Sequence, residues 1–205
     1  MIICIFGASI VWGAVDPEHS GWVGRLRSFL ELKRNFEIDV YNLGVSGDTT
    51  TDLLERFEVE CKAREPNIIL ISIGINDAQY INNESNPRTS LKDFRNNIQK
   101  VIKIAQRFTP QIIFVGFNPI DESKTMPIPW SPEKYYTNEN VKKYNDMVKL
   151  VNKENNLLFI EIFEEWMKVD YRNLLEDGLH PNSKGHQKIF ETVKDFLIKN
   201  EITKI

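Results

Sequence analysis

IICIFGAS, residues 2–9, is an unbroken apolar run that ends in a glycine turn and a serine. Such a run, apolar on both alternating faces, is typical of a strand in a parallel sheet that is covered on both sides. A run at Ile38–Leu43 is interrupted by Asp39 and Asn42, so we expect it at a sheet edge. The remaining apolar runs resemble the first and predict further strands: Ile68–Ile73, Ile112–Phe117 and Leu157–Ile162.

Amphipathic segments separate these runs. Apolar residues recur at spacings of three and four, which predicts helices with one buried stripe each. The segments are Trp22–Leu30, Leu53–Cys61, Leu91–Ala105, Val141–Val151 and Phe190–Leu197. Strands that alternate with helices five times predict an α/β fold, a three-layer sandwich with right-handed crossovers. No repeat or linker divides the chain, so we expect a single domain over residues 1–205.

The composition excludes several classes of protein. The chain has 205 residues, 26 Lys and Arg against 29 Asp and Glu, a net charge of −3 and 41% hydrophobic residues. This excludes a disordered protein and argues against a nucleic-acid binder, which would need a basic face. There is neither a signal-peptide pattern nor an apolar stretch of the ~20 residues that a membrane span needs, so we expect a cytoplasmic protein without a membrane span. The two cysteines, Cys4 and Cys61, fit buried thiols in a reducing compartment.

Polar residues suited to catalysis follow the predicted strands. Ser9 follows the first strand, Gly47 lies in NLGVSGDT after the second, and Asn76 lies in GIND after the third. Beyond the last strand and a short amphipathic stretch comes DGLHP, which contains Asp177 and His180. Because ligands of open α/β sheets bind beyond the carboxyl ends of the strands, we expect these residues at one edge of the sheet.

Each of these residues can take a role in nucleophilic catalysis. A serine hydroxyl needs a neighbouring base, for which His180 is the candidate. Asp177 can accept a hydrogen bond from the His180 ring and so turn the other ring nitrogen toward Ser9. The backbone N–H groups of Ser9 and Gly47 and the side-chain amide of Asn76 are candidate donors to an oxyanion. The sequence therefore predicts an acyl-transfer site.

The same blocks resemble the SGNH hydrolases, also called the GDSL esterase/lipase family. Ser9, Gly47 and Asn76 stand where the family has the residues of its first three blocks, and Asp177 and His180 match its D-x-x-H pair. The resemblance covers essentially the whole chain. It implies a flavodoxin-like five-stranded parallel sheet, a Ser-His-Asp triad, and hydrolysis of small-molecule esters without a cofactor.

Ala8 departs from the family pattern, which usually has an aspartate before the serine. This keeps open the alternative of a non-catalytic module that binds a sugar or an ester. A nucleotide or flavin site at residues 7–13 lacks both the Walker lysine and the GxGxxG pattern. A metal held by Asp177, His180 and His186 matches no common zinc spacing, so we predict no metal site. His186 is then expected to be structural, and His19 to be solvated or to line the mouth of the pocket.

Two long loops are expected to wall the site, residues 75–87 and residues 118–136. Trp130 is the best candidate for an aromatic wall, and the other loop aromatics are expected to pack. Asp48 is favoured as the N-cap of the helix after the second strand, with Thr49–Thr51 as alternatives. The acyl and alcohol specificity and the oligomeric state stay open.

Overall fold

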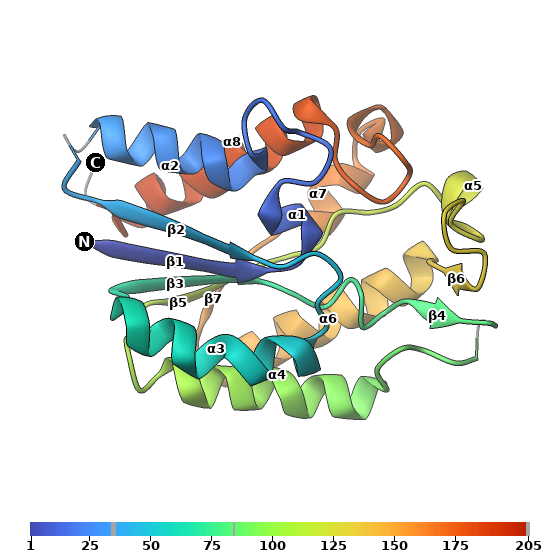
Figure 1. Ribbon diagram of the computed structural model, residues 1–205, viewed down its shortest axis with the longest axis horizontal. Coiled ribbons are helices and arrows are strands. Elements are labelled where there is room, and N and C mark those ends of the chain that lie inside the picture. Colours follow the sequence, from blue (N-terminus) through green and yellow to red (C-terminus); the bar gives the residue numbers. More distant parts are fainter. Residues whose placement is uncertain (34–35, 84, 204–205) are drawn as a thin grey trace.

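A computed structural model describes residues 1–33, 36–83 and 85–203 (Figure 1). A parallel sheet runs through the middle of the molecule in the order β2-β1-β3-β5-β7. Counting only these strands along the chain, the order is the doubly wound, flavodoxin-like one. The strands are β1 (Ile2–Gly7), β2 (Asp39–Gly44), β3 (Ile68–Ser72), β5 (Ile112–Val115) and β7 (Leu158–Ile160). The predicted strands and the edge position of β2 are confirmed.

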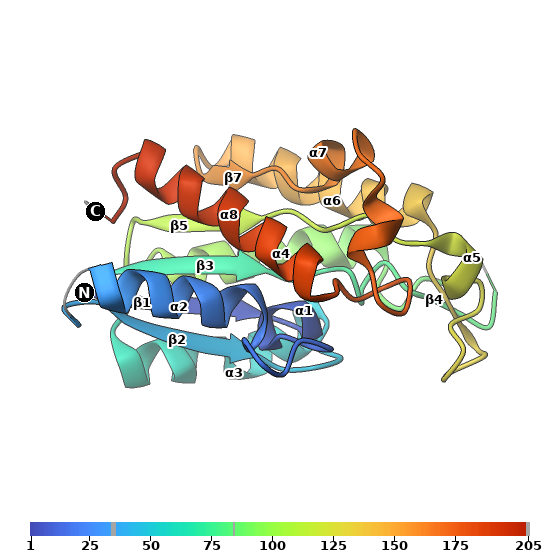
Figure 2. The ribbon, with the colours of Figure 1, turned by 90° about the horizontal axis from the view of Figure 1, so that it is seen from above.

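Helices cover both faces of the sheet, which makes three layers (Figures 1 and 2). On one face lie α2 (Gly21–Lys33) and α8 (Ser183–Lys199), and on the other lie α3 (Thr50–Arg64), α4 (Leu91–Ala105) and α6 (Asn138–Glu154). Short helices complete the chain: α1 (Ser9–Trp12), α5 (Glu122–Thr125), α7 (Phe163–Met167) and a 3-10 turn, η1 (Tyr171–Leu174). The predicted three-layer fold is confirmed, but the short helices were not predicted.

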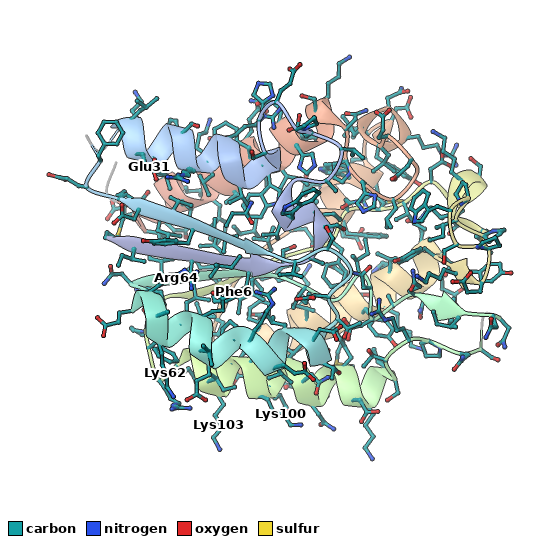
Figure 3. All side chains as sticks on the ribbon, in the orientation of Figure 1. Phe6, Glu31, Lys62, Arg64, Lys100 and Lys103 are labelled. Atoms are coloured by element: carbon teal, nitrogen blue, oxygen red, sulfur yellow. The ribbon has the colours of Figure 1, made fainter. Side chains whose placement is uncertain are left out.

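The helix α4 illustrates how the sequence fixes an element. Ser90 caps it by accepting a hydrogen bond from the Asp93 N–H, and its apolar stripe is buried against the sheet. Lys100 and Lys103 project from the opposite side into solvent (Figure 3). One side of the helix is therefore core and the other is a charged surface.

The predicted cap of α3 is wrong in part. Thr49, not Asp48, is the N-cap: its hydroxyl accepts from the Asp52 N–H, and the Asp52 carboxylate accepts from the Thr49 N–H. This reciprocal capping box satisfies two N–H groups that lack partners at a helix start. Asp48 lies one residue earlier and instead pairs with Arg56 at 2.8 Å.

Each face of the sheet has its own apolar core. Phe6 packs against Phe57 of α3 with ring centroids 4.4 Å apart, while Trp22 and Trp166 are buried in the cluster on the other face. Cys4 and Cys61 are free and buried, as expected. Among the described residues, no helix is long and apolar enough to cross a membrane.

The two predicted long loops join at the carboxyl end of the sheet. Each contains one short strand, β4 (Tyr80–Ile81) and β6 (Lys134–Tyr135), and the two strands pair antiparallel with Tyr80 opposite Tyr135. Figure 2 shows β4 and α5 at the end of the molecule opposite the N-terminus. The loops thus form one structural unit beyond the strand ends.

Candidate active site

Ser9 lies beyond the carboxyl end of β1, the strand between β2 and β3 in the sheet. The strand ends at Gly7, and Ser9 is the first residue of the short helix α1, whose C-cap is Gly13 with φ +98°. The side chain is largely buried, with a relative exposure of 9%. Its hydroxyl Oγ lies 2.9 Å from Nε2 of His180, within hydrogen-bond distance.

His180 comes from the tight turn between η1 and α8. Oδ1 of Asp177 accepts hydrogen bonds from the backbone N–H groups of Leu179 and His180, at 2.9 and 2.8 Å. Oδ2 lies 2.7 Å from Nδ1 of the His180 ring. Gly178 allows this turn because its φ of +92° lies in the left-handed region. The D-x-x-H spacing therefore closes a turn in which one carboxylate fixes both the backbone and the ring.

The charge of Asp177 is maintained by these contacts. Burial alone would raise the pKa of the carboxyl, but the hydrogen bond and charge of His180 and the two N–H donors outweigh burial. The pKa of Asp177 therefore lies below its ordinary value, so the group is a carboxylate at neutral pH. A carboxylate at Nδ1 favours the tautomer in which Nδ1 donates and Nε2 accepts from a hydroxyl.

Gly47 lies in the turn between β2 and α3. Its φ is +89°, and a Cβ added there would meet no atom within 4 Å, so the glycine serves the backbone conformation rather than close packing. Within the described part of the chain, no acceptor is found for its N–H. The Gly47 carbonyl accepts a hydrogen bond from Nη1 of Arg88 at 3.0 Å. The N–H of Ser9, at the start of α1, likewise has no carbonyl one turn earlier in the helix.

Asn76 follows β3 and is 6% exposed. Its side-chain Nδ2 donates to the carbonyl of Asp48 at 2.9 Å, and its Oδ1 accepts from the hydroxyl of Tyr136 at 3.0 Å. The amide carries two N–H groups, and the bond to Asp48 uses one. The other remains for a ligand in the hollow that Asn76 lines together with Ser9, Gly47 and His180.

This hollow has a volume of about 250 Å³. Trp130 lines it and stacks on the His180 ring, with ring centroids 6.2 Å apart and an interplanar angle of 25°. Trp130 is therefore placed where the sequence predicted an aromatic wall. A larger hollow of about 840 Å³ lies elsewhere, and neither Ser9 nor His180 lines it.

The structure brings all the predicted site residues together at one edge of the sheet, but the sequence did not predict three of their neighbours. Tyr136 was expected to pack only, and Gln79 and Arg88 were not singled out, yet all three line the hollow. Their contacts join loops that are far apart in sequence. The long loops after β3 and β5 were the only signal that could have pointed to them.

The two remaining histidines lie outside the hollow. His186 is fully buried: its Nδ1 accepts from the Trp22 N–H at 3.2 Å and its Nε2 lies 3.1 Å from the Ala14 carbonyl. It holds α8 to the segment after α1, as expected for a structural residue. His19 is half-exposed beside Asp16 and lines the larger hollow, not the one at Ser9. Within the described residues, no group of three or more His, Cys, Asp or Glu side chains is arranged to hold a metal ion.

Asp77, next to Asn76, does not face the hollow. It is fully buried, and its carboxylate accepts from the Thr50 N–H at 2.9 Å and from the Thr50 hydroxyl at 2.6 Å. Burial raises its pKa to about 6, although the Thr50 donors act in the opposite direction. Asp77 therefore ties the loop after β3 to the start of α3.

Comparison with known proteins gives a consistent result. The model of the GDSL-like Lipase/Acylhydrolase family matches residues 5–188. An acetylxylan esterase of Geobacillus stearothermophilus is 28% identical over 73% of this chain and 67% of its own length. The uncharacterized lipoprotein YqeF of Bacillus subtilis (strain 168) is 24% identical over 87% of this chain and 80% of its own length. The crystal structure of a lipase/acylhydrolase from Enterococcus faecalis shares the fold, with a TM-score of 0.77, 24% identity, and coverage of 96% of this chain and 94% of that one.

Proposed function

The chain belongs to the GDSL-like lipase/acylhydrolase family, and on that basis we propose that it is a serine esterase in which Ser9, His180 and Asp177 form the catalytic triad. The observation that carries this proposal is the pair of hydrogen-bond distances, 2.9 Å from Ser9 to His180 and 2.7 Å from His180 to Asp177. Ser9 as the nucleophile is then within hydrogen-bond distance of its base, His180, and His180 is within hydrogen-bond distance of Asp177, which orients it.

In the proposed reaction, Oγ of Ser9 attacks the ester carbonyl carbon while its proton passes to Nε2 of His180. The N–H groups of Ser9 and Gly47 and the Asn76 amide donate to the oxyanion. The intermediate collapses, and the leaving alcohol takes the proton from His180. Water then attacks the acyl-enzyme with His180 as the base, which releases the acid and restores Ser9.

We propose that the substrates are small esters with short acyl groups such as acetyl. A hollow of about 250 Å³ has room for a short acyl group beside Ser9, and one relative is named an acetylxylan esterase. Trp130 offers a flat apolar face beside His180 for the leaving group, which fits an aryl or sugar ring. A cytoplasmic location stays a prediction.

The alternative of a non-catalytic binding module was motivated by Ala8. Ala8 is 4% exposed and belongs to an apolar cluster with Leu43 and Ile75. The contacts from Ser9 to His180 and from His180 to Asp177 are present even though the residue before Ser9 is an alanine. No specific observation therefore favours the binding module.

The test is hydrolysis of p-nitrophenyl esters from acetyl to octanoyl by the wild type and by Ser9→Ala. We expect turnover by the wild type, highest kcat/KM for the shortest acyl groups, and no turnover by Ser9→Ala because the nucleophile is absent. Thermal unfolding of both proteins controls for folding. Undiminished turnover by a folded Ser9→Ala variant would rule out the proposed nucleophile.

A further inference from the structure

A directed chain of hydrogen bonds passes through the Asn76 amide. Nε2 of Gln79 donates to the hydroxyl of Tyr136 at 2.7 Å, and this hydroxyl donates to Oδ1 of Asn76 at 3.0 Å. Nδ2 of Asn76 in turn donates to the Asp48 carbonyl at 2.9 Å. Each group donates once to the next, so the chain fixes which end of the Asn76 amide is oxygen and which is nitrogen. It connects the loops after β2, β3 and β5.

The members of this chain are shielded from water. Relative exposure is 1% for Tyr136, 3% for Gln79 and 6% for Asn76. Burial raises the pKa of the Tyr136 phenol above its ordinary range, so the group keeps its proton and remains a donor. Hydrogen bonds in such surroundings hold their partners more firmly than bonds in water.

The Tyr136 backbone is anchored independently of its hydroxyl. The Tyr136 N–H donates to the Thr125 carbonyl at 3.0 Å, and the Thr125 hydroxyl donates to the Tyr136 carbonyl at 3.1 Å. The preceding residue, Tyr135, pairs with Tyr80 in the β4–β6 ladder. The loop therefore has its own supports, and the hydroxyl acts mainly on Asn76.

We propose that Tyr136 is a positioning residue that aims the free N–H of Asn76 at the oxyanion. The amide is held at both ends: Tyr136 fixes its oxygen and Asp48 fixes one of its N–H groups. The remaining N–H then points in one direction before substrate arrives, which is how a preorganised donor stabilises developing charge. The proposal rests on the proposed esterase function and assigns the long loop after β5 a part in the oxyanion site.

The test begins with Tyr136→Phe, which removes the hydroxyl and keeps the ring. Without it the Asn76 amide can rotate, so we expect kcat to fall on the order of 10-fold, less than the roughly 10²-fold loss expected of Asn76→Ala. KM should change little, because the oxyanion forms only on the way to the transition state. Tyr144→Phe is the matched control, since it also removes a buried tyrosine hydroxyl, one that donates to the Thr89 carbonyl.

A double-mutant cycle separates positioning from a general structural role. If Tyr136 acts through Asn76, Tyr136→Phe should cause no further loss of kcat in the Asn76→Ala background. The control should lower the thermal midpoint by a similar amount while keeping kcat. An unchanged kcat in Tyr136→Phe, or equal fold-losses in both backgrounds, would overturn the positioning role alone. A folded wild type without ester turnover would overturn the proposed function and this role together.

Discussion

Among single residues, Asp177 has a carboxylate whose two oxygens have different partners. Its Oδ1 accepts from two backbone N–H groups and shapes the turn, while its Oδ2 accepts from the His180 ring. An asparagine keeps an oxygen for the backbone donors but turns an N–H₂ group toward Nδ1 of the ring. The ring would then have to present its proton at Nε2, where the proposed reaction needs a base.

Asp177→Asn should therefore fold and lose catalysis. We expect kcat for p-nitrophenyl acetate to fall on the order of 10⁴-fold, because the wrong His180 tautomer faces Ser9. Steady-state kinetics and circular dichroism on the same preparations provide the check. If kcat stays within a few-fold of the wild type while the variant is folded, Asp177 does not orient the base.

Sequence reasoning identified residues that stand in recognisable motifs. DGLHP contains both the turn and the pair that the turn brings together, and its occurrence in order with the motifs of Ser9, Gly47 and Asn76 predicted the roles of Asp177 and His180. Tyr136 could not be identified in this way, because its hydroxyl meets a residue 60 positions earlier. Asp48 was predicted as the helix cap because aspartate is a favoured N-cap residue, but Thr49 takes that position and Asp48 pairs with Arg56 of α3 instead.

Among the secondary-structure elements, α8 is linked through His186 to Ala14, just after α1, and to Trp22 in α2. The Trp22 N–H donates to Nδ1, so Nε2 must carry the proton that the Ala14 carbonyl accepts. Burial lowers the pKa of His186 below its ordinary value, and neighbouring Arg25 adds to this, whereas Asp16 and the Ala14 hydrogen bond act in the opposite direction. Protonation at Nδ1 would remove the acceptor for Trp22.

Because the pKa of His186 is lowered in the folded protein, the free energy of unfolding should fall as the pH is lowered. Above pH ~6.5, the ordinary pKa of histidine, both folded and unfolded chains hold His186 neutral and its contribution is complete. Below that pH the unfolded chain binds a proton that the folded state resists, so the free energy of unfolding falls by up to about 1.4 kcal/mol per pH unit. Urea unfolding of the wild type and of His186→Gln between pH 7.5 and 5.5 measures this. The wild type should lose stability relative to the variant on acidification, and a constant difference would contradict the link.

Elements long enough to show a pattern were predicted, and very short ones were not. The helix α4 was recognised from its repeating apolar stripe, and β1 from its unbroken apolar run. The strands β4 and β6 have two residues each, too few for any period, and they form only because two loops meet. These short elements support Tyr136, so the part of the fold that was missed is the part nearest the site.

At the scale of the whole molecule, the doubly wound sheet assembles a site that no segment contains. The strands β1, β2 and β3 carry Ser9, Gly47 and Asn76 on the turns that follow them, and the chain beyond β7 adds Asp177 and His180. Because parallel strands end at the same edge, the order of motifs in the sequence was enough to predict where they meet. The volume of the hollow and its inner wall depend on loop packing, which the sequence left open.

If His180 activates Ser9 as a nucleophile, a phosphonate ester should label Ser9 covalently. A p-nitrophenyl phosphonate places phosphorus where the ester carbonyl would lie, and attack by Oγ of Ser9 releases p-nitrophenolate. Mass spectrometry of the intact protein and of its peptides should find one phosphonyl group, on Ser9, with none on Ser9→Ala and slower labelling of His180→Ala. A folded wild-type protein that stays unlabelled at Ser9, or is labelled elsewhere, would contradict the assignment of Ser9 as the nucleophile.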